Sequence, residues 1–295
     1  MRSARSVTEI VPTHVVREGG GFKVRRPFRM GRVLSPFLLI DEMGPVDYGP
    51  GEAVGAPWHP HRGFETVTYL LDGRMRHEDS AGNNGELNPG DVQWMTAGRG
   101  IIHCEEPHEG FLKTGGRMHG FQIWVNLPKA HKMMQPRYQE VPSSESPVVE
   151  EDGVWARVIA GECMGTSSSI DTKIPITLIH VKMEAGAQLI QQFESSLNGM
   201  IYVFGGEIVI DNGFRMKTRP IAHGLGTKQQ IQDGELGLLS EGEEIIIGST
   251  LASEFLILAG PELNEPIERY GPFVMNTREE IRQAFLDYQN GTLAD

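Results

Sequence analysis

Four residues of the sequence offer metal-binding atoms at the spacing of β-strands. His59 and His61 stand one residue apart in "WHPHRGFET", and His103 and Glu105 stand one residue apart in "GIIHCEEP". Alternate side chains of a strand share a face, so each pair points to one side of its strand. If the two strands are neighbours in one barrel, three imidazoles and one carboxylate converge inside it.

Each of these residues also has a simpler explanation when it is taken alone. A lone His-x-His pair is usually a surface feature, because short motifs specify function loosely. His103 can be a hydrogen-bonded interior histidine, and Glu105 can be a salt-bridge partner. The two pairs together favour a metal site more strongly than either pair alone, because turn-bounded strands of one predicted domain carry both of them. Cys104 points away from the shared face and is expected to be a buried, apolar thiol.

The ligand types narrow the choice of metal. Three nitrogens and one oxygen, without sulfur, suit iron, manganese, nickel or copper and do not indicate a structural zinc site. Four protein ligands on an octahedral ion leave two open positions for water, dioxygen or a chelating substrate. An iron centre that uses dioxygen is therefore chemically reasonable.

The elements that must position these residues are mainly strands. Segments such as "FETVTYLLDGRMRHED" and "GFQIWVNLP" are rich in β-branched and aromatic residues and end at Gly, Asp or Pro, as in an all-β sandwich or barrel. One helix is predicted in "NTREEIRQAFLDYQNG", where Thr277 and Glu280 form a capping box. Its apolar positions recur at helical spacing, so we expect it to pack on the β core.

The chain is predicted to hold two domains. The polar segment 141–153, "VPSSESPVVEEDG", separates residues 1–140 from residues 154–295. "ELNPGDVQWMTAGRGIIH" in the first half matches "QIQDGELGLLSEGEEIII" in the second half in rhythm, with a turn glycine, an apolar run and a second glycine. The sequence therefore resembles a duplicated β domain.

The second domain is expected to lack metal ligands. The repeat sets Gln192 and Glu194 against the histidine pair of the first domain. It sets Ile247 and Ser249 against the other two candidate ligands. A hydrophobic side chain in a ligand position argues against a metal there, so we interpret this half as structural or partner-binding.

Composition excludes several classes of function. The net charge is −12 in 295 residues, which argues against direct contact with nucleic acid or anionic lipid. Apolar runs are too short to span a bilayer, and two cysteines give no disulfide framework. We expect a cytoplasmic protein, with a nuclear location open if the source is eukaryotic. Residues 1–32 carry eight basic side chains against two acidic ones. We interpret this basic stretch as a solvated strand edge or as a docking patch for an acidic partner.

Four stretches resemble one family. "APWHPHRGFETVTYLLDG", "HEDSAGNNGELNPGDVQWMTAGRGIIHCEEP" and "GFQIWVNLP" look like the N-terminal cupin of pirins, and "GPFVMNTREEIRQAFLDYQNG" is similar to their C-terminus. The resemblance is dense over residues 25–140 and looser beyond. It implies two tandem cupin barrels, double-stranded β-helices like a jelly roll, with a short C-terminal helix and one iron ion in the first barrel.

The resemblance also implies the ligand set His59, His61, His103 and Glu105. The general cupin pattern ends its first motif with a glutamate that often binds metal, and Glu65 stands there. Pirins use a glutamate that matches Glu105, so we assign that residue. Glu65 is either a residue that orients a histidine or a polar strand residue outside the site. Other polar candidates for the pocket are Gln93, Arg62, Glu78 and His119.

Two functions follow from the resemblance. Several pirins act as quercetin 2,3-dioxygenases, oxidoreductases that open a flavonol ring with O2, and Glu105 would then accept the proton of the substrate hydroxyl. The alternative is a non-enzymatic, iron-dependent regulatory protein that binds a transcription factor or a metabolic enzyme. A cupin that only stores or senses metal is a third possibility. Fe(II) is the expected cofactor, with Mn, Ni, Cu and Co as alternatives.

Overall fold

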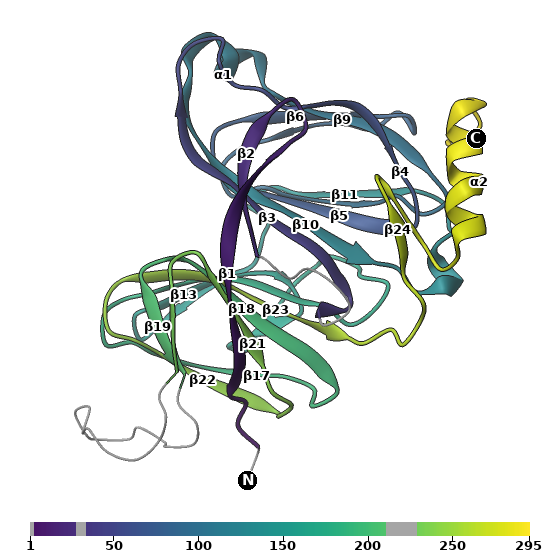
Figure 1. The fold of residues 1–295 in the computed structure, drawn as a ribbon. Helices are drawn as coiled ribbons and strands as arrows, with labels where there is room; N and C mark the ends of the chain where they lie inside the picture. The colour runs from purple at the N-terminus through teal and green to yellow at the C-terminus, as the bar shows by residue number, and fades with distance from the viewer. Residues whose placement is uncertain (1–2, 28–33, 211–228) are drawn as a thin grey trace. The chain divides into compact units, whose positions relative to one another are not determined.

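The structure is a computed structural model that describes residues 3–27, 34–210 and 229–295. The chain divides into two compact units, each taking residues from distant parts of the sequence (Figure 1). The first unit holds residues 14–26, 34–146 and 262–295, and the second holds residues 3–13, 27, 147–210 and 229–261. The domain limits drawn from the sequence stay a prediction. Part of the basic N-terminal stretch, residues 1–2 and 28–32, lies outside the described residues.

The first unit is built from two sheets and a C-terminal segment. One sheet has the strand order β11-β8-β5-β10-β3-β2, and the other has the order β4-β9-β6-β7. The elements are β2 (Phe22–Pro27), β3 (Phe37–Tyr48), β4 (Ala56–His61), β5 (Phe64–Asp72), β6 (Met75–Asp79), β7 (Asn84–Leu87), β8 (Val92–Thr96), β9 (Ile101–Pro107), α1 (Glu109–Thr114), β10 (Gly116–Asn126), the 3-10 helix η2 (Lys129–His131), β11 (Arg137–Val141), β24 (Glu268–Tyr270), β25 (Phe273–Met275) and α2 (Arg278–Gln289).

The second unit repeats this arrangement. Its sheets have the orders β21-β18-β23-β16-β13-β12 and β17-β22-β19-β20, and the start of β1 pairs with β21. The elements are β1 (Val7–Glu18), which runs on into the first unit, β12 (Val148–Glu151), β13 (Val154–Ala160), β14 (Glu162–Cys163), β15 (Thr166–Ser167), β16 (Thr177–Met183), β17 (Gln188–Gln192), β18 (Leu197–Gly205), β19 (Glu207–Ile210), β20 (Gln229–Gln232), β21 (Glu235–Leu239), β22 (Glu244–Ser249) and β23 (Ser253–Pro261).

The two strand orders correspond element by element. The series β8-β5-β10-β3 and β4-β9-β6-β7 of the first unit match β21-β18-β23-β16 and β17-β22-β19-β20 of the second. This correspondence confirms the expected fold, two tandem cupin barrels with a short C-terminal helix.

The register corrects one detail of the sequence repeat. His59 of β4 stands opposite His103 of β9, whereas Leu189 of β17 stands opposite Ile247 of β22. The strand register therefore makes Leu189 the equivalent of His59, three residues before Gln192. Leu189 and Ile247 are both buried in one apolar cluster of the second unit.

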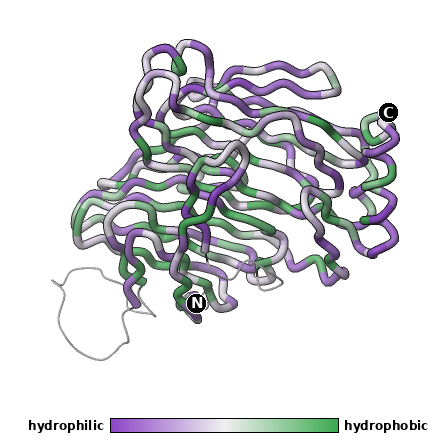
Figure 2. The backbone as a smooth tube through the Cα atoms, turned by 45° about the horizontal axis from the view of Figure 1, so that its top comes forward, coloured by the Kyte–Doolittle hydropathy of each residue, from purple (hydrophilic) through white to green (hydrophobic). Residues whose placement is uncertain are grey.

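The C-terminal helix forms as the capping pattern predicts. The Thr277 hydroxyl accepts a hydrogen bond from the Glu280 backbone N–H, and the Glu280 carboxylate accepts one from the Thr277 N–H. Its apolar face, with Ile281 and Ala284, packs against Phe273 of β25 in the first unit. In Figure 2 the helix next to the C-terminus shows both hydrophobic and hydrophilic stretches, as expected for one buried face.

No helix of the described residues combines the length and the apolar character that are needed to cross a bilayer.

Candidate metal centre

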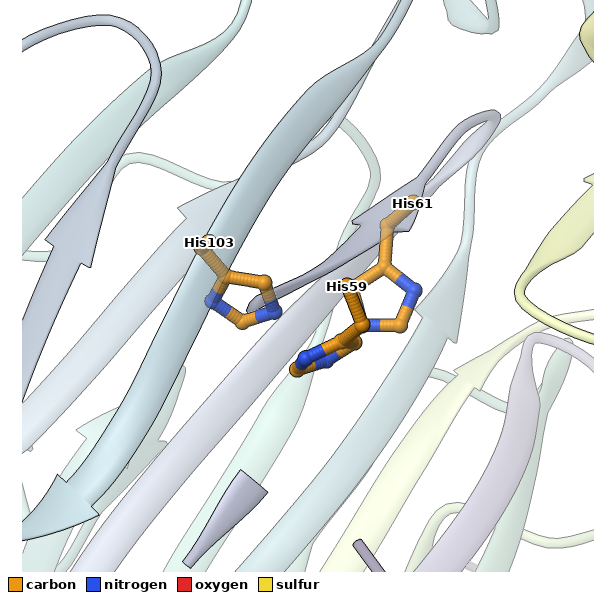
Figure 3. Close-up of side chains that lie close together, drawn as sticks. All are labelled: His59, His61 and His103. Atoms are coloured by element: carbon orange, nitrogen blue, oxygen red, sulfur yellow. The ribbon is translucent and has the colours of Figure 1, made fainter. Parts of the chain in front are cut away.

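Strand pairing brings the three predicted histidines together. β4 and β9 are antiparallel neighbours with His59 opposite His103, and His61 follows on the same strand as His59. The ring centroids lie 4.3 Å apart for His59 and His103, 5.0 Å for His61 and His103, and 4.7 Å for His59 and His61. One ring nitrogen of each residue lies within 4.8 Å of the others, and Figure 3 shows the three rings gathered in one space.

Backbone carbonyl groups fix the tautomers of the His-x-His pair. Nδ1 of His59 lies 2.7 Å from the Pro57 oxygen, and Nδ1 of His61 lies 3.3 Å from the Pro272 oxygen. A carbonyl oxygen only accepts, so both Nδ1 atoms must donate, and each neutral ring then carries a lone pair on Nε2. The two Nε2 atoms lie 3.0 Å apart. Two lone pairs at that distance repel each other unless a cation lies between them.

His103 adds a third lone pair in the same space. Its Nε2 atom is buried and has no hydrogen-bond partner among the described residues. Burial, with the adjacent rings of His61 and His59, lowers the pKa of His103 well below its ordinary value. Burial and the His59 ring lower the pKa of His61 to about 3. Both buried rings are therefore neutral at pH 7, which is the form that binds metals.

The donor set fits a divalent transition metal. Two nitrogens bound to one ion at right angles, each at about 2.1 Å, lie about 3 Å apart, close to the observed Nε2 separation. Metal-bound histidines also commonly donate their other N–H to a backbone carbonyl, as His59 and His61 do. The three rings can therefore hold a metal ion, whose identity the geometry leaves open.

Glu105 lies near His103, two residues further along β9. A carboxylate oxygen of Glu105 falls within 4.8 Å of ring nitrogens of His103 and His77, which form a second group of ligand atoms. The Thr68 hydroxyl donates to Glu105 Oε1 at 2.7 Å. Glu105 also lines the same cavity as His59 and His61. The complete set of four ligands remains a prediction.

His77 is a buried residue near the site that the sequence analysis missed. It lies on β6, whose antiparallel pairing with β9 sets His77 opposite Glu105 and Asp79 opposite His103. His77 is stacked on Tyr138 at a centroid distance of 5.0 Å. The available signal was the spacing of His77 and Asp79, again one residue apart on a strand.

The remaining candidates have other partners. Glu65 is buried and accepts from the Thr96 hydroxyl at 2.6 Å, and it belongs to neither group of ligand atoms. Cys104 is buried, as predicted. The four polar candidates lie outside the lining of the cavity. They are Gln93, bonded to His77, Arg62, paired with Asp287, Glu78, paired with Arg76, and His119, bonded to Glu42.

A cavity of about 510 Å³ opens beside the histidines, a volume typical of small-molecule sites. Its wall includes the aromatic side chains of Phe22, Trp58 and Trp124. The Arg269 guanidinium lies over the Trp124 ring, 4.6 Å from its centroid, and donates to the Leu38 oxygen at 3.3 Å. Arg269 has no carboxylate within 4.0 Å among the described residues. The wall therefore combines aromatic side chains with charged ones. Arg26 is paired with Glu18 and Asp41 of the same wall, whereas Arg269 is left to meet an anionic group.

The C-terminal segment supports the strand that carries His61. The Val274 N–H donates to the Arg62 oxygen at 3.1 Å, and Arg62 pairs with Asp287 of α2 at 2.6 Å. Lys132 is buried and donates from Nζ to the oxygens of Gly63, Asn126 and Val274 at 2.6 to 2.9 Å. These bonds tie residues 272–287 to the segment that directly follows the His-x-His pair.

Comparisons with known proteins agree with this architecture. The pirin family model matches residues 21–125, and the model of the pirin C-terminal cupin domain matches residues 178–294. Human pirin is 40% identical over 295 residues, covering 98% of this chain and 94% of human pirin. A pirin-like protein of Solanum lycopersicum is 38% identical over 291 residues, covering 97% and 92%. The crystal structure of quercetin 2,3-dioxygenase from Acinetobacter baumannii is 35% identical, with a TM-score of 0.89 and 99% of both chains covered. The chain therefore belongs to the pirin family.

Proposed function

We propose that this protein is a metal-dependent dioxygenase of the quercetin 2,3-dioxygenase type. The observation that carries the proposal is the convergence of three imidazoles beside an aromatic cavity, with His59 and His61 in its wall and their Nε2 lone pairs 3.0 Å apart. The similarity to the structure of quercetin 2,3-dioxygenase from Acinetobacter baumannii supports the reaction type. The substrate would be a flavonol or a related planar aromatic molecule, with O2 as the second substrate.

The residues that would hold the metal are His59, His61, His103 and Glu105. Fe(II) is the metal we propose, since nitrogen and oxygen donors suit iron, and Mn, Ni, Cu and Co are the alternatives. When bound, the metal supplies Lewis acidity and open coordination positions for the substrate and O2. The Nδ1–H bonds of His59 and His61 would leave their Nε2 lone pairs available to hold the ion.

Glu105 is the proposed proton acceptor. A flavonol must lose the proton of its 3-hydroxyl group before its ring reacts with oxygen, and a carboxylate beside the cavity can take it. The hydrogen bond from Thr68 at 2.7 Å orients this carboxylate. Gln122, whose amide oxygen lies 2.9 Å from the same hydroxyl, also lines the cavity.

The cavity wall matches a planar substrate with an acidic oxygen. Trp58 is exposed at the wall next to His59, and Trp124 offers an aromatic side chain within the cavity. Aromatic side chains bind flat rings by stacking and by contact with ring edges. Arg269 would neutralise a phenolate oxygen of the bound flavonol.

The test is turnover by the full-length protein. Iron-loaded protein mixed with quercetin should lose the flavonol absorbance and consume O2, and chelator-treated protein should do neither. His103→Ala should abolish stoichiometric iron, measured by elemental analysis, with the fold intact by circular dichroism. His131→Ala, a change of a histidine on η2 outside both groups of ligand atoms, is the matched control and should keep its iron.

Two outcomes would contradict the proposal. If His103→Ala retains as much iron as His131→Ala, the assignment of His103 as a metal ligand is refuted. A protein that holds stoichiometric iron but leaves quercetin intact would refute the proposed dioxygenase activity and favour an iron-dependent binding protein instead.

A further inference from the structure

Three polar side chains form a buried group behind His103, away from the cavity. His77 and Gln93 are fully buried and Asp79 is nearly so. His77 and Asp79 come from β6, and Gln93 comes from β8. None of the three lines the cavity, so they are not placed to contact a substrate.

Asp79 sets the direction of the hydrogen bonds in this group. Its carboxylate accepts from the backbone N–H groups of Ala81 and Asn83, both at 2.9 Å, and from the Asn83 side chain at 2.8 Å. A carboxylate that accepts three such bonds is held in the ionised form, which cannot donate. His77 Nε2, 3.4 Å from Asp79 Oδ2, must therefore carry the proton and donate it.

The direction of the next two contacts follows. With the proton on Nε2, Nδ1 of a neutral His77 is an acceptor. The Gln93 amide nitrogen lies 3.0 Å from this Nδ1, and Nδ1 of His103 lies 3.4 Å from it. The Gln93 amide nitrogen can only donate, and a lone pair on Nδ1 of His103 would be repelled by the lone pair of His77, so His103 must donate too and the two donors share one acceptor. A proton on Nδ1 of His103 leaves the lone pair on its Nε2, the buried atom that has no hydrogen-bond partner among the described residues.

We propose that His77, fixed by Asp79, is a positioning residue that holds His103 as the Nδ1–H tautomer with Nε2 directed at the metal. The proposal rests on the metal site of the proposed function and adds the chain from Asp79 through His77 to His103. A partner of this kind both fixes the orientation of a ligand ring and raises its basicity.

His77 has a second candidate role, because it is grouped with His103 and Glu105 as a metal ligand. The hydrogen bonds argue against that role. Its Nε2 is committed to Asp79, and its Nδ1 accepts from Gln93. A metal on either nitrogen would have to break one of these buried bonds, whereas Nε2 of His103 is available at no such cost.

The test compares two substitutions at position 77 in the full-length protein. His77→Asn keeps an acceptor oxygen close to the position of Nδ1, so it should still accept from His103. His77→Phe keeps the aromatic ring that stacks on Tyr138 but removes the hydrogen bonds to Asp79, Gln93 and His103. Cobalt(II) is the probe, with its affinity measured by competition against a chelator and its coordination read from its visible absorption.

The expected results differ between the two variants. His77→Phe should bind cobalt(II) roughly 10- to 100-fold more weakly than the unsubstituted protein, the usual effect of losing such a partner, while His77→Asn should stay within about threefold. The cobalt spectrum of His77→Asn should match that of the unsubstituted protein. If the cobalt(II) affinity is kept in His77→Asn and lost in His77→Phe, the hydrogen-bond acceptor at position 77 matters and the packing of its ring does not.

A second measurement reads the tautomers in the unsubstituted protein. In metal-free protein labelled with ¹⁵N-histidine, two-bond ¹H–¹⁵N spectra report the tautomer of each ring, and His103→Gln identifies the signals of His103. We expect the proton on Nδ1 of His103 and on Nε2 of His77.

Three results would overturn the proposal. They are a proton on Nε2 of His103, an unchanged cobalt affinity in His77→Phe, and complete loss of cobalt binding in both variants, which would make His77 a ligand. None of these readouts needs turnover, so a protein that fails to open quercetin can still support the role of His77.

Discussion

The ion pair between Arg62 and Asp287 leads to a sharp prediction about stability. Arg62 directly follows His61, and Asp287 lies on α2, which packs on the first unit. The two charged atoms lie 2.6 Å apart, and Arg62 donates from Nε to the Arg99 oxygen as well. Asp287→Ala removes the carboxylate and leaves a guanidinium with 5% of its side chain exposed.

The size of the loss follows from the burial of the two partners. Breaking a fully buried pair costs about 3–5 kcal/mol, because the remaining charge is stranded, whereas exposed pairs contribute about 0–1 kcal/mol. Asp287 is 22% exposed, so water can enter the vacated position. We expect Asp287→Ala to lower the free energy of unfolding by about 2 kcal/mol, between these two cases.

The assay must report the first unit alone. Three of the four tryptophans, Trp58, Trp94 and Trp124, lie in that unit, so a Trp155→Phe background makes urea unfolding by fluorescence specific for it.

Arg62→Met combined with Asp287→Ala is the critical control, because it removes the stranded charge and should recover most of the loss. A double variant no more stable than Asp287→Ala, or a loss below about 0.5 kcal/mol in the single variant, would refute this reasoning.

Three further predictions concern other parts of the molecule. Thr277→Ala removes the helix cap and should cost about 1 kcal/mol in urea unfolding, with iron content unchanged. Burial opposes ionisation of Glu254, but hydrogen bonds from His180 and Lys182 lower its pKa from 4.5 to about 2. Its stabilisation is present above pH 4.5 and is lost as the pH falls toward 2, so Glu254→Gln should be less stable by about 1 kcal/mol at pH 7 and no less stable near pH 2. Arg269→Met should weaken quercetin binding by about tenfold in iron-loaded protein, and unchanged affinity would exclude Arg269 from the binding site.

Much of the candidate site could be predicted because its geometry is local. The spacing of His59 and His61 puts both rings on one face of a strand whatever the rest of the fold does. The capping box of α2 is equally local, since Thr277 and Glu280 bond each other. These features follow from backbone periodicity, which a sequence displays directly.

The features that could not be predicted depend on contacts between distant segments. The role of His77 needs the register of β6 against β9, which no residue near His77 encodes. The place of Arg269 and Pro272 in the cavity wall depends on the C-terminal segment packing on the first unit. The sequence repeat likewise misplaced the equivalent of His59 by three residues, because polar residues at the end of β17 imitate the ligand pattern.

A segment synthesised after the second barrel belongs to the first barrel. Residues 262–295 pack with residues 14–26 and 34–146, and Val274 covers the apolar side chains of Leu38 and Phe64. During translation Val274 cannot cover these side chains until the ribosome has finished the second barrel. The nascent protein therefore passes through a stage with exposed hydrophobic surface on the first barrel, which is the kind of surface that chaperones recognise.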